Sequence, residues 1–133
     1  MANHFEVIDA DGHITEEDNQ LKQYMDSRYV KRAATLTPRD SWDRSLGGTL
    51  GTRAKDAKSW LDAMDKGGVS TAVLYPTNGL SLLARNDLDP ELSLAICQAY
   101  NNWIAEFCRH SPDQLKFAAM LPVHDVHLAC REL

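Results

Sequence analysis

The feature that most constrains the fold is an alternation of short apolar runs with longer helical patterns. Three runs are typical of buried strands: "FEVID" at 5–9, "TAVLYP" at 71–76 and "KFAAMLP" at 116–122. The second run has no polar–apolar alternation, which favours burial on both of its faces. Because helical patterns separate the runs, the sequence predicts βαβ units and a parallel α/β sheet.

The helices have clear start and stop signals. Apolar residues recur at helical spacing from 55 to 66, and two glycines follow. The strongest helix begins at 89–91, where a capping Asp, a proline and an acid in the first turn come together. A last helix is expected after Asp125. Its inward face is predicted to consist of Val126, Ala129, Cys130 and Leu133.

A long polar stretch, about 14–54, separates the first strand from the first of these helices. It holds "DNQLKQYMD" at 18–26, which is typical of one short helix, and the glycine-rich "GGTLGT" at 47–52. The glycine-rich part lacks the Lys-Ser/Thr that follows in a phosphate-binding loop. A flexible segment of a long active-site loop is the better interpretation.

The stretch "VIDADGHITEED" at 7–18 invites comparison with a calcium-binding loop. In an EF-hand the first position is an acid, but here it is Val7. The twelfth position should be a bidentate Glu, but here it is the shorter Asp18. Only six residues precede the stretch, and they end in a strand-like run in place of a helix. The calcium interpretation is therefore set aside.

A transition-metal site at the end of a strand suits the same stretch better. Chemistry in parallel α/β proteins gathers at the carboxyl ends of the strands, and Asp11 and His13 follow the first strand directly. Residues two apart in extended backbone point to one side, and a carboxylate with an imidazole suits zinc or manganese. Asp9 is expected on that side too, as a partner holding His13. The alternative is a plain turn formed by Asp9, Asp11 and Gly12, with His13 exposed.

Other candidate site residues follow the strands. Tyr75 and Asn78, at the end of the second strand, are placed to line a substrate pocket, although Tyr75 fits a core position equally. Glu16 is a candidate contact to substrate or metal, with a solvated loop acid as its alternative. His124 follows the third strand, and with His127 it is either a metal-binding pair or the start of a helix with one member solvated.

Four stretches together resemble the amidohydrolase-related family, in its aminocarboxymuconate-semialdehyde decarboxylase-like branch of metal-dependent TIM barrels. They are "VIDADGHITE", "WLDAMDKGGVSTAVLYPTNGL", "NDLDPELSLAICQAYNNWIAEFC" and "PDQLKFAAMLPVHDVHLACREL". The most specific part is Ala-Tyr-Asn-x-Trp at 99–103, followed by Leu-Lys-Phe-Ala-Ala-Met-Leu-Pro. In that family an acid-or-His, x, His motif after the first strand supplies two metal ligands. The resemblance places these ligands at Asp11 and His13.

The resemblance implies a larger enzyme. Residues 1–133 would form the N-terminal part of a (β/α)8 barrel, about three of its eight βα units, without the ligands that later strands supply. The implied function is a metal-dependent hydrolase or non-oxidative decarboxylase. Its substrate would be a small carboxylic or cyclic compound, and its divalent metal zinc, with manganese as the alternative. A second hypothesis is a non-catalytic, truncated α/β fragment that self-associates through its open sheet edges.

Composition limits the partners. The formal charge of −5, with no Lys/Arg cluster, argues against nucleic acid. No apolar run approaches membrane-spanning length, so no membrane partner is expected. Three cysteines without a Cys-x-x-Cys motif are expected to be buried free thiols, as in a reducing cytoplasm. Unpaired parallel edges predict a homo-oligomer.

Overall fold

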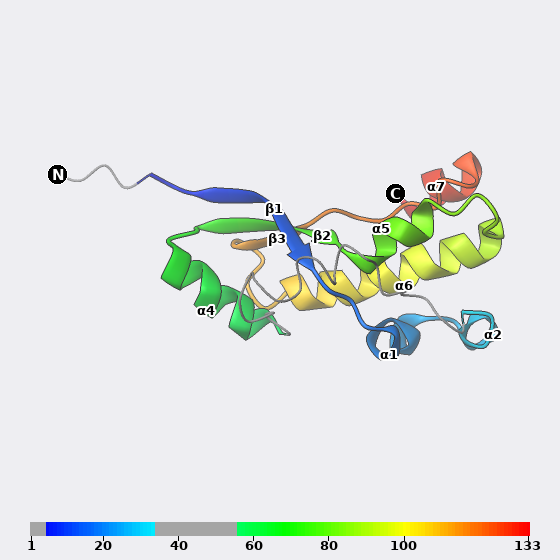
Figure 1. The fold of residues 1–133 in the computed structure, drawn as a ribbon, viewed down its shortest axis with the longest axis horizontal. Coiled ribbons are helices and arrows are strands. Elements are labelled where there is room, and N and C mark those ends of the chain that lie inside the picture. The colour runs from blue at the N-terminus through cyan, green and yellow to red at the C-terminus, as the bar shows by residue number, and fades with distance from the viewer. Residues whose placement is uncertain (1–4, 34–55) are drawn as a thin grey trace.

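The sheet consists of three parallel strands in the order β1-β2-β3 (Figure 1). The structure is a computed structural model that describes residues 5–33 and 56–133. The strands are β1 (Ile8–Ile14), β2 (Thr71–Pro76) and β3 (Leu115–Phe117). A helix follows each strand, so the predicted parallel βα units are confirmed.

Seven helices are present in the described residues. They are α1 (Asp18–Leu21), the 3₁₀ helix η1 (Lys22–Tyr24), α2 (Ser27–Val30), α4 (Ala57–Gly67), α5 (Asn78–Leu83), α6 (Pro90–Cys108) and α7 (Val126–Glu132). The side chains of Asp56, Asp89 and Asp125 cap α4, α6 and α7 by accepting a hydrogen bond from a backbone N–H of the first turn. Gly68 ends α4 at φ 68°, a left-handed conformation that suits glycine.

Two strand boundaries differ from the sequence prediction. The first strand runs over 8–14 in place of 5–9, so Asp11 and His13 lie inside it and not beyond its end. The third strand ends at Phe117, although its apolar run continues to 122. Beyond Phe117, the side chain of Asn101 in α6 replaces a neighbouring strand as the hydrogen-bond partner of the backbone. It accepts a hydrogen bond from the Met120 N–H at 2.8 Å and donates one to the Met120 carbonyl at 2.9 Å.

The helices cover one face of the sheet. In Figure 1, α4 and α6 lie on the same side of the three strands. Along β2 the side chains alternate between buried and half-buried, with Ala72 and Leu74 completely enclosed. The expectation that β2 is buried on both faces was therefore wrong, because no described element covers the second face.

Helix α6 forms the centre of the core. Its buried side chains include Tyr100 and Ile104, and both Cys97 and Cys108 are buried free thiols, as predicted. Cys130 is exposed, which contradicts the expectation for the third cysteine. The inward face predicted for the last helix was also wrong, because α7 buries Leu128 instead.

The long polar stretch holds more structure than expected over its first half. The short helix predicted at 18–26 is present as α1 and η1, and α2 follows. The glycine-rich stretch at 47–52 lies outside the described residues. None of the helices in the described part of the chain is long and apolar enough to cross a membrane.

Candidate metal centre

An irregularity in β1 decides which side chains share a face. Asp9 pairs with Ala72 and Gly12 with Leu74, so β1 uses one more residue than β2 between these pairs. Asp11 and His13 consequently lie on the uncovered face, and Gly12 turns toward the helices. The extended backbone confirms that this stretch is not a calcium-binding loop.

The same irregularity separates Asp9 from the candidate ligands. Its register partner, Ala72, belongs to the helix-covered face. The Asp9 carboxylate accepts a hydrogen bond from the backbone N–H of Asp11 at 3.0 Å. The prediction that Asp9 holds His13 is therefore not supported by the contacts. Asp9 instead stabilises the irregular backbone between the two strand segments.

Asp11 and His13 form a close pair of accessible donors. His13 Nε2 lies 3.8 Å from Asp11 Oδ1, and the two side chains are 45% and 93% exposed. Two ligands that each bind one ion at about 2.1 Å can be at most about 4.2 Å apart, so the pair fits a single ion. The donor set, one imidazole and one carboxylate, is also appropriate for a divalent transition metal.

Tyr75 lies beside this pair. It is the register partner of His13 on β2, and the two ring centroids are 6.2 Å apart with 39° between the ring planes. Tyr75 is half-buried, on the same face of the sheet as His13. The structure thus brings the candidate pocket residue Tyr75 together with the candidate ligands.

Glu16 and Asn78 form a different, enclosed cluster. The Glu16 side chain is 1% exposed, so its interpretation as a solvated loop acid was wrong. Its carboxylate accepts hydrogen bonds from the N–H groups of Thr77, at 3.1 Å, and of Gly79. The Asn78 side chain donates to the Glu16 carbonyl at 3.0 Å. Both residues lie together and are buried, unlike the exposed pair.

Burial dominates the electrostatics of this cluster. It raises the pKa of the Glu16 carboxyl above its ordinary value, and the backbone hydrogen bonds offset only part of the rise. Burial also raises the pKa of Tyr100, and the nearby charge of Glu16 adds to that effect. The Tyr100 hydroxyl and Asn78 Oδ1 are buried without a hydrogen-bond partner within the described residues.

His124 does not join the candidate ligands. Its Nδ1 lies 3.0 Å from the Ser93 hydroxyl, and its Nε2 lies 2.5 Å from the Arg85 carbonyl. Because a carbonyl only accepts, Nε2 donates to it, and both ring nitrogens of His124 are engaged by hydrogen bonds. His127 is exposed at the start of α7. The helix-start alternative is therefore correct, and the metal-binding alternative for this pair was wrong.

The ligand shell is not complete within the described residues. In residues 5–33 and 56–133, no group of three or more His, Cys, Asp or Glu side chains is placed to hold a metal ion. Asp11 and His13 are therefore a pair of candidate ligands, fewer than the three or four protein ligands that hold a zinc ion.

Solved structures with the same fold include a decarboxylase with bound manganese. No protein-family model and no curated protein matches the sequence. A 2,6-dihydroxybenzoate decarboxylase from Rhizobium superposes with a TM-score of 0.60 and 22% identity, covering 96% of this chain and 33% of its own. A dihydroxybenzoic acid decarboxylase from Polaromonas, with bound manganese and the inhibitor 2-nitroresorcinol, gives 0.59 and 20%, with the same coverage.

An amidohydrolase from Mycobacterium avium subsp. paratuberculosis superposes with a TM-score of 0.66 and 17% identity, covering 98% of this chain and 46% of its own. The chain therefore spans a third to under half of the length of these proteins. At such identities the likeness lies in the fold. The three parallel strands and their helices have the architecture of the N-terminal βα units of a TIM barrel.

Proposed function

We propose that this chain contributes the first metal-binding strand of a metal-dependent hydrolase or non-oxidative decarboxylase. The observation that carries the proposal is the pair Asp11 and His13, exposed on the uncovered face of β1 and 3.8 Å apart. The fold shared with two decarboxylases and an amidohydrolase supports the same kind of enzyme. The amidohydrolase-related family resembled by the sequence is in agreement with it.

Each residue has a defined part in this proposal. Asp11 and His13 would hold the ion, and further ligands would come from outside the described residues. When bound, the ion would act as a Lewis acid, activating a water molecule or polarising a substrate carboxylate and hydroxyl. Tyr75, beside His13, would contact a ring or carboxylate of the substrate. Direct contact of Glu16 and Asn78 with substrate stays a prediction. Both side chains are buried, so a substrate would reach them only if the surrounding residues moved.

The proposed metal is zinc, with manganese as the competing ion. One imidazole and one carboxylate suit both ions, and manganese is bound in one of the similar structures. We propose a small carboxylic or cyclic compound as the substrate. The similar structures include one with 2,6-dihydroxybenzoate, which is both.

Metal content after dialysis tests the site. Elemental mass spectrometry should find zinc or manganese with the wild-type chain and only background with Asp11→Ala/His13→Ala. The matched control is Asp62→Ala/His127→Ala, which removes one exposed carboxylate and one exposed imidazole elsewhere. Equal metal in all three proteins, or none in the wild type, would overturn the proposal.

Two assays separate the two reaction types. With zinc or manganese added, release of CO₂ from 2,6-dihydroxybenzoate would indicate a decarboxylase, whereas opening of a cyclic amide would indicate a hydrolase. Either activity should disappear in Asp11→Ala/His13→Ala. Activity that survives in this variant would show that the pair does not hold the ion used in the reaction.

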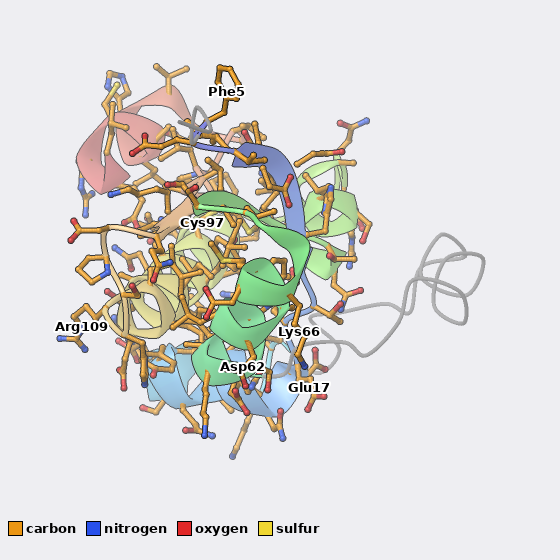
Figure 2. All side chains as sticks on the ribbon, turned by 90° about the vertical axis from the view of Figure 1, so that its left-hand side faces the viewer. Phe5, Glu17, Asp62, Lys66, Cys97 and Arg109 are labelled. Carbon is orange, nitrogen blue, oxygen red and sulfur yellow. The ribbon has the colours of Figure 1, made fainter. Side chains whose placement is uncertain are left out.

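A second candidate is self-association through β1, which a specific observation favours. Within the described residues β1 has β2 as its only strand partner, and exposed apolar side chains lie at the first residue of β1 and just before it. Phe5 is 78% exposed and Ile8 60% exposed, and Phe5 projects away from the ribbon in Figure 2. An exposed apolar edge strand favours pairing with a second copy.

Sedimentation velocity over a range of concentrations tests this candidate. The wild type should sediment as a dimer or larger species, and Ile8→Lys should shift it toward the monomer. Leu80→Lys, at an exposed apolar position on α5, is the control. A wild type that stays monomeric at every concentration would exclude self-association through β1.

A further inference from the structure

The backbone pairing of β1 and β2 ends at a proline. Ile14 and Pro76 are the last register partners of the two strands. Proline has no N–H to donate, so the backbone ladder has no donor on β2 at this position. Unless another group joins the strands, their carboxyl ends are free to separate just beyond His13 and Tyr75.

The side chain of Glu16 joins them where the backbone stops. Its two carboxylate oxygens accept hydrogen bonds from the backbone N–H groups of Thr77 and Gly79. These two residues lie one and three positions after Pro76. The Asn78 side chain closes the link in the other direction by donating to the Glu16 carbonyl. Three hydrogen bonds therefore continue the contact between the two chain segments past the end of the sheet.

Close packing fixes the carboxylate in this position. A Cβ atom added at Gly79 would lie 2.6 Å from Met120 Sδ and 3.0 Å from Glu16 Oε1. Any larger residue at this position would therefore require the Met120 side chain to shift. Met120 is itself held through its backbone by Asn101 of α6, so the link is anchored to the core.

We infer that Glu16 is a positioning residue for the candidate metal pair. By tying the carboxyl ends of β1 and β2 together, it keeps His13 opposite Tyr75 and holds His13 and Asp11 on the same face. The inference rests on the proposed function, because it assigns Glu16 a role toward the ion that Asp11 and His13 would bind. In this role Glu16 acts through the positions of Asp11 and His13 and not by binding the ion itself.

Glu16→Gln is the sharpest variant, because it keeps the volume of the side chain. Its amide offers an oxygen to one N–H but turns an NH₂ group toward the other, so one hydrogen bond is lost. The control is Asp89→Ala, which removes the cap of α6 and weakens the fold at a distance from the pair. Comparing the two separates a local role of Glu16 from general destabilisation.

Two measurements need no metal. Amide hydrogen exchange at Thr77 and Gly79 should be at least about tenfold faster in Glu16→Gln than in the wild type, with the Leu74 amide unchanged. In the wild type, nuclear Overhauser contacts should join the rings of His13 and Tyr75, and they should weaken in Glu16→Gln but not in Asp89→Ala. Unchanged contacts between the rings would overturn the inference.

Titration with Zn²⁺ and Co²⁺ tests the link to the metal. Glu16→Gln should bind Zn²⁺ about 10- to 100-fold more weakly than the wild type and give an altered Co²⁺ visible spectrum, whereas Asp89→Ala should match the wild type in both. Equal affinity and spectra in Glu16→Gln would overturn the inference while the proposed function stands. A wild type that binds no metal would overturn the proposed function, and the ring contacts would still decide whether Glu16 positions His13.

Discussion

The two faces of the sheet differ although they are made by alternate residues of the same strands. On the helix-covered face, Ile14, Ala72 and Leu74 are buried. On the other face, His13 and Tyr75 are partly exposed and lie side by side. The difference teaches that the helices, and not the strand sequence, decide which alternate residues become core. Stability is concentrated on one face, and candidate chemistry on the other.

Truncation of Leu74 should give the largest effect on stability. This side chain is completely buried beneath the helices, so Leu74→Ala should lower the free energy of unfolding by about 2–5 kcal/mol. The neighbouring Val73→Ala, on the half-buried face, should cost under about 1.5 kcal/mol, because less apolar surface returns to water. Urea unfolding of both variants checks this. Equal losses would break the distinction between the two faces.

Gly79→Ala should be the next most disruptive change. The added Cβ would meet Met120 Sδ at 2.6 Å, an overpacking that costs about 1–3 kcal/mol in free energy of unfolding. The matched control is Gly67→Ala in α4, where the added Cβ meets only Val69 Cγ2 at 3.8 Å. Gly67→Ala should be neutral or stabilising by up to about 1 kcal/mol. Thermal unfolding of both variants would contradict this if Gly79→Ala melted as high as the control.

Glu16 should make the stability depend on pH. Its folded pKa is raised above the ordinary value of 4.5 because burial disfavours the charged form. The folded state then binds more protons than the unfolded state, so this contribution is fully present below pH 4.5 and is lost as pH rises through the raised pKa. The free energy of unfolding of the wild type, relative to Glu16→Gln, should fall over that window. A relative gain with rising pH would mean that the N–H bonds outweigh burial.

Removal of the exposed pair should have the smallest effect on stability. Without metal, Asp11→Ala/His13→Ala should change the free energy of unfolding by no more than about 0.5 kcal/mol, because both side chains are exposed and a surface ion pair contributes little. Differential scanning calorimetry of the metal-free proteins checks this. A large loss would show that the pair serves the fold as well as the proposed site.

The pattern of strands and helices was predictable because its signals are local. The cap at Asp89 and the stop at Gly68 depend on neighbouring residues, and β2 has the boundaries that its apolar run indicated. The end of β3 was not predictable in this way. It depends on Asn101, which is close to Met120 in space and captures its backbone.

The candidate site was predicted only in part. Spacing alone placed Asp11 and His13 on one side of the chain, and the structure agrees on their proximity. The burial of Glu16 could not be foreseen, because its partners Thr77 and Gly79 are about sixty residues away. One signal was present nonetheless. Pro76 has no N–H and ends the backbone pairing of β2, so the N–H groups that follow it need acceptors other than a neighbouring strand.

The irregularity in β1 means that this strand has two phases of alternation within seven residues. Before the irregularity, Ile8 is the register partner of Thr71 and faces the same side of the sheet. After it, His13 is the register partner of Tyr75 and faces the same side. A substitution in β1 changes the side chain on the uncovered face, but it does not change which positions of the strand face that side. A slip of one position upstream would bring Asp9 into line with Asp11 and His13 and turn Ile8 inward. The number of candidate ligands on the uncovered face of β1 therefore depends on the number of residues in the strand as much as on which residues they are. An insertion or deletion would change it.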